Sequence, residues 1–249
     1  MKGNMQAIIL AAGMGTRLKE ITKKIPKCMI KVKNHTIIER QLKQLDKMKL
    51  SRIIIVDGYL KNILETYINS LDIKTPIIFI ENNIYDSTNN IYSLYLSKDY
   101  LKEEDTILLE SDLIFRDDTL ANLSKQYDTT AVISKYCTWM DGTTVKIDTH
   151  GKITHFIPKQ YIANENKNRL FKTVNIYKIN KEYSNNYLVP FLEFFLKTFS
   201  ANEYYEQVFR LISEIKTDSM STIEIGPDNW YEIDNKNDLK NAEKLKFLS

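Results

Sequence analysis

Short apolar runs alternate with amphipathic stretches over the first half of the chain. The apolar runs predict buried strands at residues 7–10, 52–56, 76–81 and 106–110. The stretches between them predict helices at residues 37–48, 61–71 and 91–100, because their apolar residues recur at helical spacing. In the first of these, Ile37, Ile38, Leu42, Leu45 and Met48 fall on one face. This alternation predicts an α/β fold with a doubly wound, mainly parallel, Rossmann-like sheet and ligands at the carboxyl ends of its strands.

The pattern loosens in the second half of the chain. Strands are expected at residues 130–136, 144–148, 152–156 and 170–179, followed by helices at 189–199 and 203–214. Short strands at 222–226 and 230–234 and a terminal helix at 237–247 complete the prediction. No linker, repeat or low-complexity stretch divides the sequence. We therefore expect a single domain over residues 1–249, with a small β-rich lobe over about residues 130–180.

The first predicted strand runs into a loop of small residues that ends in an arginine, Leu10-Ala-Ala-Gly-Met-Gly-Thr-Arg17. Backbone N–H groups exposed in such a loop beside a helix start bind anions, and Arg17 and Lys27 add positive charge. A lone Gly-x-Gly is weak evidence, since parallel-sheet turns also use glycine for packing. The spacing nevertheless lacks the third glycine of a dinucleotide motif and the Gly-Lys-Ser/Thr of a P-loop. We expect the ligand to be a nucleoside triphosphate.

This motif, with Pro26-Lys27 downstream, resembles the opening of the sugar-phosphate nucleotidylyltransferase superfamily. Within that superfamily the chain is most similar to the small cytidylyltransferases that activate phosphocholine and related phosphorylated amines. Three segments carry the narrower likeness: Val56-Asp-Gly-Tyr-Leu-Lys61, Asn89-Asn-Ile-Tyr-Ser-Leu-Tyr-Leu96 and Tyr231-Glu-Ile-Asp-Asn235. The resemblance runs from residue 6 to beyond residue 234. It implies the nucleotide-diphospho-sugar-transferase type of fold and Mg²⁺-dependent transfer of CMP from CTP to a small phosphorylated acceptor.

Such a transfer needs charge neutralisation and positioning more than a general base, because the attacking phosphate oxygen is already a nucleophile. Mg²⁺ usually takes one or two carboxylates together with phosphate oxygens. Asp112 and Asp234 each end a predicted strand, and both match positions where the resembled family places its magnesium aspartates. The alternative for either is a turn or helix-capping aspartate. Glu110 could share a face with Asp112 and is a weaker candidate.

The resemblance assigns Arg17 to the β- and γ-phosphates, and Lys27 to the α-phosphate and the incoming phosphate. Arg17, Lys27, Asp112 and Asp234 form the expected catalytic set. Paired amides at Asn89 and Asn90 can donate to and accept from a pyrimidine edge, although either could be a helix cap. Cytosine is the implied base, and the residue chemistry leaves uracil open. Besides Arg17 and Lys27, the expected nucleotide-binding residues are Leu10, Ala11, Ala12, Gly13, Met14, Gly15, Thr16, Asp57, Gly58, Tyr59, Ser87, Asn89, Asn90 and Ser93.

The acceptor is expected to bind in the β-rich lobe. A quaternary ammonium group favours an aromatic cage, although most tyrosines of this chain are expected to serve packing. The candidates for such a cage are Tyr136, Trp139, Tyr161, Trp230 and Tyr231. Lysines around the lobe suit instead an acceptor with its own carboxylate. Lys159 loosely matches the acceptor-phosphate lysine of sugar-activating relatives. By resemblance phosphoglutamine of a capsule-modification pathway is favoured, with phosphocholine and aminoethylphosphonate left open. The expected acceptor residues are Tyr136, Trp139, Asp141, Lys159, Lys172 and Asn175.

Composition narrows the remaining classes. A net charge of +3 without a basic face argues against nucleic acid as a partner. Cys28 and Cys137 have no metal-ligand spacing. The chain shows no signal peptide and no apolar run of membrane length, so it is expected to be cytoplasmic and not membrane-bound. A sugar-1-phosphate nucleotidylyltransferase and a catalytically silent nucleotide-sensing subunit remain alternatives. The oligomeric state is open, a homodimer included.

Overall fold

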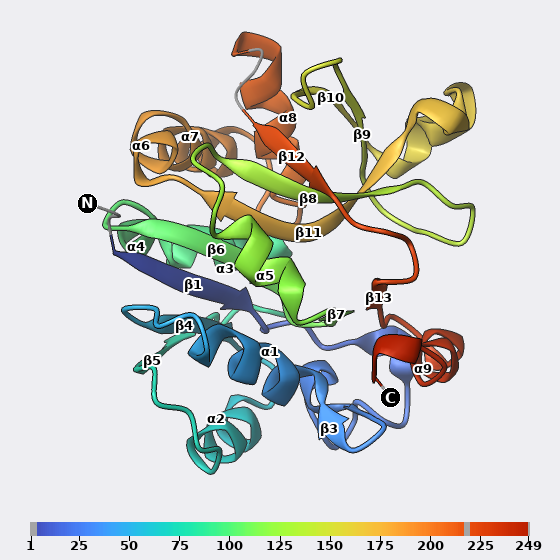
Figure 1. The fold of residues 1–249 in the computed structure, drawn as a ribbon. Coiled ribbons are helices and arrows are strands. Elements are labelled where there is room, and N and C mark those ends of the chain that lie inside the picture. Colours follow the sequence, from blue (N-terminus) through green and yellow to red (C-terminus); the bar gives the residue numbers. More distant parts are fainter. Residues whose placement is uncertain (1–3, 217–219, 249) are drawn as a thin grey trace.

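The computed structural model describes residues 4–216 and 220–248, and one nine-stranded mixed sheet runs through them (Figure 1). Its strands are β1 (Met5–Leu10), β4 (Ile53–Asp57), β5 (Ile77–Glu81), β6 (Asp105–Glu110), β8 (Thr130–Lys135), β9 (Thr144–Ile147), β10 (Ile153–Ile157), β11 (Phe171–Ile179) and β12 (Ser221–Glu224). The order is β10-β9-β11-β6-β1-β4-β5, and β8 joins β11 to β12. Strands β6, β1, β4 and β5 are parallel, as the sequence predicts.

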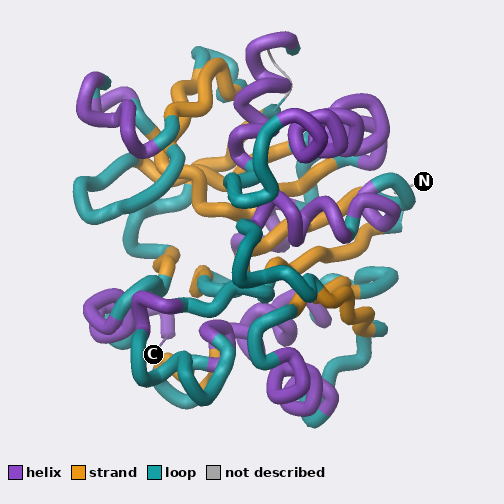
Figure 2. Tube along the Cα trace, turned by 180° about the vertical axis from the view of Figure 1, so that it is seen from behind, coloured by secondary structure: helices purple, strands orange, loops and turns teal. Residues whose placement is uncertain are grey.

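The central strands are mostly apolar, as expected for strands whose two faces are both covered by helices. On one face, Ile9 of β1 and Ile55 of β4 belong to an apolar cluster with α1 (Ile37–Asp46), α2 (Lys61–Asn69) and α5 (Asp118–Leu123). Ile8 and Ile54, one position away, belong to a second cluster on the other face. Alternate residues of each strand therefore serve opposite layers. Figure 2 shows the strands, seen from behind, between two groups of helices.

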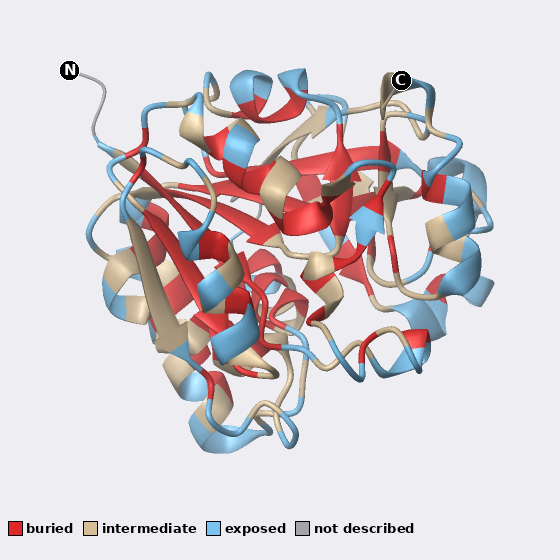
Figure 3. Cartoon of the chain, turned by 90° about the horizontal axis from the view of Figure 1, so that it is seen from below, coloured by how far each residue is buried: buried red, intermediate tan, exposed pale blue. Residues whose placement is uncertain are grey.

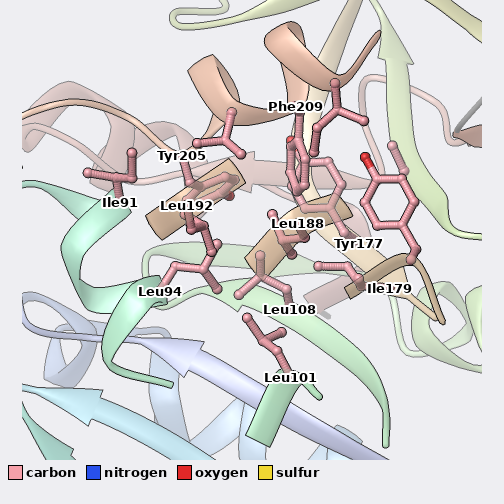
Figure 4. Close-up of a cluster of buried hydrophobic side chains, with 14 of the residues drawn as sticks. Ile91, Leu94, Leu101, Leu108, Tyr177, Ile179, Leu188, Leu192, Tyr205 and Phe209 are labelled. Atoms are coloured by element: carbon pink, nitrogen blue, oxygen red, sulfur yellow. The ribbon is translucent and has the colours of Figure 1, made fainter. Parts of the chain in front are cut away.

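The second cluster is formed with α3 (Asn90–Leu96), α4 (Lys98–Leu101), α7 (Val189–Thr198) and α8 (Glu206–Ile215). Figure 4 shows side chains of this cluster, among them Leu94, Leu108, Tyr177 and Phe209. Tyr177 belongs to β11 and Phe209 to α8, and their ring centroids are 5.0 Å apart. Helix α8 is thereby fixed on the sheet by large buried side chains. Figure 3 shows how buried residues fill the interior beneath the exposed outer faces of the helices.

The predicted β-rich lobe continues the main sheet. β11 pairs antiparallel with β6 on one side and with β8 and β9 on the other. The β9–β10 hairpin extends the sheet beyond β11 (Figure 1). The fold class is confirmed, and the antiparallel β11 is the strand that joins its two halves.

Several boundaries differ from the sequence prediction. The helix expected at 91–100 is divided at Ser97 into α3 and α4, and the terminal helix α9 (Lys236–Ala242) ends earlier than expected. The prediction lacked β7 (Leu113–Phe115) and α5, because elements this short show no periodicity. The remaining short elements are β2 (Lys31–Val32), β3 (His35–Thr36), β13 (Trp230–Glu232) and α6 (Lys181–Tyr183). Among the described residues, every helix is too short or too polar to cross a membrane.

Candidate active site

A cavity of about 580 Å³ opens where β1 and β6 end. The loop after β1 forms one side, and residues from β10, β11, α8 and β13 form the other. Most of the residues expected at the site line it. These are Leu10, Ala11, Ala12, Gly13, Gly15, Thr16, Arg17, Lys27, Asn89, Asn90, Ser93, Asp112, Asp141, Lys159, Lys172, Asn175 and Asp234.

The loop after β1 is held in shape by one glycine and by two hydroxyl groups. Gly15 has φ 61°, the left-handed region, and a Cβ there would lie 3.0 Å from Cβ of Lys27. Thr22 Oγ1 donates to the Gly15 carbonyl at 3.0 Å, and Tyr59 Oη donates to the Thr22 carbonyl at 2.9 Å. A Cβ at Gly13 would meet nothing within 4 Å. Gly15 therefore positions Lys27, whereas Gly13 leaves space on the open side of the loop.

Three carboxylates meet opposite this loop although they are far apart in the sequence. β13 pairs antiparallel with β7, and the Ile233 N–H donates to the Asp112 carbonyl at 3.0 Å. The Asp238 carboxylate accepts from the backbone N–H of Asp234 at 2.9 Å, which fixes the end of β13. Asp112, Glu232 and Asp234 can each offer an oxygen within 4.8 Å of the others. Glu232 is not among the site residues expected from the sequence. Its position two residues before Asp234 on the same strand could have indicated it, since such residues share one face.

Lys27 lies between two of these carboxylates. Its Nζ is 2.7 Å from Asp112 Oδ2 and 2.6 Å from Asp234 Oδ1, and Arg17 reaches the same Asp234 oxygen at 2.9 Å. Burial alone would lower the pKa of Lys27, but the two carboxylates outweigh it through charge and hydrogen bonding. The net effect raises the pKa of Lys27, so this side chain is a permanent cation at the centre of the site.

The carboxylate cluster has the chemistry that a divalent cation requires. Asp112 Oδ1 is buried and has no hydrogen-bond partner among the described residues. Burial raises the pKa of Glu232 to about 7; Lys172 opposes this rise, and the charges of Asp112 and Asp234 add to it. Hard oxygen ligands of this kind, one or two of them carboxylates, are what Mg²⁺ prefers. The residues present therefore fit Mg²⁺, with Glu232 as a third acidic group beside the two expected aspartates.

The amides expected to contact the base take part in bonds within the protein. Asn89 Oδ1 accepts from the Asn90 N–H at 2.8 Å and caps α3. Asn90 Nδ2 donates to Glu110 Oε1 at 3.0 Å, and Asn90 Oδ1 accepts from the Tyr205 N–H at 2.9 Å. Ser93 Oγ accepts from Asn82 Nδ2 at 3.2 Å. Asn90 thus joins α3, β6 and the start of α8 at the wall of the cavity.

Some expected nucleotide-binding residues lie outside the cavity lining: Met14, Asp57, Gly58, Tyr59 and Ser87. Tyr59 supports the loop through Thr22, as described above. A Cβ at Gly58 would lie 2.8 Å from the Asn82 carbonyl, so this glycine allows two chain segments to approach closely. Asp57 is fully buried, and burial together with the charge of Glu65 raises its pKa to about 7.

The aromatic residues expected around the acceptor also lie outside the cavity. Trp139 stacks on Tyr231, with ring centroids 4.9 Å apart and an interplanar angle of 5°. Tyr136 packs against apolar side chains behind the site. The other acceptor candidates line the cavity, and Lys159 pairs with Asp141 at 2.7 Å.

Burial raises the pKa of the Cys28 thiol to about 12, so this thiol stays protonated at neutral pH.

The fold is that of a nucleotidyltransferase. A model of the nucleotidyl transferase family matches residues 6–181, and the chain belongs to this family. Along 97% of the chain the fold is similar to that of CTP:phosphocholine cytidylyltransferase from Streptococcus pneumoniae, with a TM-score of 0.77, 23% identity and 98% of that chain covered.

Two curated relatives carry names that state a particular reaction. The chain is 34% identical over 134 residues to CTP:phosphoglutamine cytidylyltransferase of Campylobacter jejuni, which covers 52% of this chain and 52% of that protein. It is 26% identical over 242 residues to CMP-5'-(3-aminopropyl)phosphonate synthase of Streptomyces rubellomurinus, which covers 96% of this chain and 38% of that protein. The chain thus spans about half the length of these relatives or less. The family resemblance found in the sequence is confirmed.

Proposed function

We propose that this protein is a Mg²⁺-dependent cytidylyltransferase that transfers CMP from CTP to a small phosphorylated amine or amino-acid-like acceptor and releases pyrophosphate. One observation carries the proposal. A small-residue loop with Arg17 faces the carboxylates of Asp112, Glu232 and Asp234 across one cavity, with Lys27 between them. The loop suits a triphosphate, and the carboxylates suit the cation that accompanies it.

In this reaction an oxygen of the acceptor phosphate forms a bond to the α-phosphorus of CTP, and the bond to the β-phosphate oxygen breaks. Backbone N–H groups of residues 11–15 bind the phosphates, and Arg17 stabilises the negative charge of the leaving pyrophosphate. The chain's own contribution is orientation and charge, because no proton has to be removed from the attacking oxygen. Mg²⁺, when held by Asp112 and Asp234, neutralises charge on the triphosphate.

Lys27 has a role that depends on these same carboxylates. Its Nζ now contacts one oxygen of Asp112 and one of Asp234, both of which are also candidate cation ligands. A cation on these oxygens would repel the Lys27 ammonium group toward the phosphates. There Lys27 would hold the α-phosphate and the incoming phosphate together. This role predicts that loss of Lys27 lowers kcat more than it weakens CTP binding.

The name of the Campylobacter relative supports phosphoglutamine as our preferred acceptor. Two further proteins to which the chain is similar carry the names choline-phosphate cytidylyltransferase and 2-aminoethylphosphonate cytidylyltransferase. Phosphocholine and 2-aminoethylphosphonate therefore belong in the test. The acceptor residues that line the cavity are polar or charged: Asp141, Lys159, Lys172 and Asn175.

The test measures pyrophosphate release with each of the four ribonucleoside triphosphates and a panel of phosphorylated amines, phosphorylated amino acids and sugar 1-phosphates. We expect release with CTP and an amine or amino-acid acceptor, and none when Mg²⁺ is removed with a chelator. Turnover confined to UTP or dTTP with a sugar 1-phosphate would replace this proposal with that of a sugar-activating enzyme. Nucleotide binding without turnover on any acceptor would indicate a nucleotide-sensing subunit.

A further inference from the structure

Helix α8 carries one acidic and one basic side chain, Glu206 and Arg210, at the wall of the cavity. Tyr205, just before the helix, and Phe209 within it are fully buried in the core beside β11 (Figure 4). Glu206 and Arg210 each follow one of these residues, so they lie one helical turn apart on the adjacent stripe. Both line the cavity. Because the aromatic pair fixes the helix, these two side chains are held in register with the site.

Glu206 is a buried carboxylate with an unused acceptor. Only 7% of the residue is exposed, and its Oε2 has no hydrogen-bond partner among the described residues. A buried carboxylate oxygen left unpaired is costly, because it has lost its water without gaining a hydrogen bond. Burial raises the pKa of Glu206, although Lys172 and Asn90 favour its anion. The nearby Lys172 ammonium donates to the Thr173 carbonyl. A ligand that brings N–H donors to Glu206 would remove this cost.

Arg210 is the complementary group. Glutamate four residues before arginine on a helix is a spacing that normally favours an ion pair. Within residues 4–216 and 220–248, however, the Arg210 guanidinium has no ion pair with Glu206 or with any other carboxylate, and the hydrogen bond that Ser213 Oγ donates to this residue is accepted by its backbone carbonyl. A guanidinium presents a planar set of donors that matches a carboxylate in a two-pronged contact. The cavity thus holds a cation-binding and an anion-binding group one turn apart.

The cavity lacks the lining that a trimethylammonium group would need. Such a group has no N–H donors and is bound by faces of several aromatic rings. In the described part of the chain the lining contains Tyr85, Phe156 and Tyr204, and no ring contact joins any two of them. Tyr85 packs on Tyr59 beside the nucleotide loop, and Phe156 packs on Phe209. A primary ammonium group, which donates hydrogen bonds to Glu206, suits this wall better.

We propose that Glu206 and Arg210 bind the α-amino-acid head group of the acceptor, with its ammonium on Glu206 and its carboxylate on Arg210. The acceptor class is a phosphorylated or phosphonate α-amino acid, whose other end reaches Lys27. This inference rests on the proposed function, and it adds the two residues that select among acceptors.

The experiment compares three acceptors that differ by one group at a time. They are 2-amino-5-phosphonopentanoate, 4-aminobutylphosphonate, which lacks only the carboxylate, and the N-trimethyl derivative of the latter. Wild type, Glu206→Gln and Arg210→Gln are each assayed for kcat and for KM of acceptor and CTP. Glu214→Gln, on an exposed position of the same helix, and Arg169→Gln, also exposed, are matched controls. Thermal unfolding of each variant shows whether the fold is kept.

We expect wild type to use the amino acid best and the trimethylated compound least. Glu206→Gln should raise the KM of both amine acceptors by about tenfold or more, with the KM of CTP unchanged, since a charge-assisted hydrogen bond is lost. Arg210→Gln should raise the KM of the amino acid alone and abolish its advantage over the amine. The two control variants should behave as wild type.

Two results would overturn the inference in different ways. Turnover with equal or better use of the trimethylated acceptor, or an acceptor KM unchanged in Glu206→Gln and Arg210→Gln, would remove the head-group site and leave the proposed function intact. Absence of pyrophosphate release from CTP with every acceptor tested would overturn the proposed function, and this inference with it.

Discussion

Replacement of Lys27 by alanine tests the central ion cluster most sharply. The side chains of Lys27, Asp112 and Asp234 are only 14%, 18% and 13% exposed, and Lys27 contacts both carboxylates. Removal of Lys27 from this largely buried cluster takes away the ion pair of Asp112, leaves Asp234 paired with Arg17, and costs about 3 kcal/mol. For a chain of this length, that loss lowers Tm by roughly 6–12 °C.

The change in Tm on adding Mg²⁺ distinguishes loss of the ion pair from a simple loss of packing. The cation can take the place of the missing ammonium between the two carboxylates, so we expect Mg²⁺ to raise the Tm of Lys27→Ala much more than that of wild type. Lys159→Ala is the matched control, because the Lys159–Asp141 pair is exposed and worth about 0.5 kcal/mol. Thermal unfolding with and without Mg²⁺ measures all three proteins. Equal stability of Lys27→Ala and wild type, or an equal response to Mg²⁺, would contradict a role for Lys27 in balancing these carboxylates.

Two further predictions concern the loop and a buried acid. Gly15→Ala should lower stability by about 1–2 kcal/mol and reduce activity, because residue 15 is in the left-handed conformation and its new Cβ would meet Lys27. Gly13→Ala should leave stability unchanged. Equal urea midpoints for the two variants would contradict this prediction. Asp57, with its pKa raised to about 7, stabilises the fold below its ordinary pKa and loses that contribution as pH rises through 7. Asp57→Asn should therefore be more stable than wild type at pH 8 by roughly 2 kcal/mol, with little difference at pH 4, in urea unfolding across this range; a difference independent of pH would contradict it.

The parallel half of the fold could be predicted because its strands and helices are long and strongly periodic. β1, β4 and α1 lie close to their expected positions, and the small-residue loop follows β1 as its composition indicated. The division of the predicted helix at Ser97 was not visible, since the apolar spacing continues across it. The early end of α9 was missed for a similar reason, because apolar residues follow it in a further helical turn.

The site was predictable where its residues follow strands, and less so where it depends on pairing between distant segments. Asp112 and Asp234 were expected together, but the contact between β7 and β13 that joins them also brings in Glu232. Trp139 was a reasonable cage candidate by residue type, yet it stacks on Tyr231 instead. Glu206 and Arg210 carry no motif, and only the position of α8 over the sheet brings them to the cavity.

In the proposed reaction, Asp112 holds the cation for CMP transfer. The most direct measurement is Mg²⁺-dependent pyrophosphate release from CTP by wild type and Asp112→Ala, with a fold check by circular dichroism and thermal unfolding. We expect Asp112→Ala to stay folded and to release pyrophosphate about a thousandfold more slowly or worse, because both the cation and Lys27 lose a partner. Release at the wild-type rate in folded Asp112→Ala would contradict it.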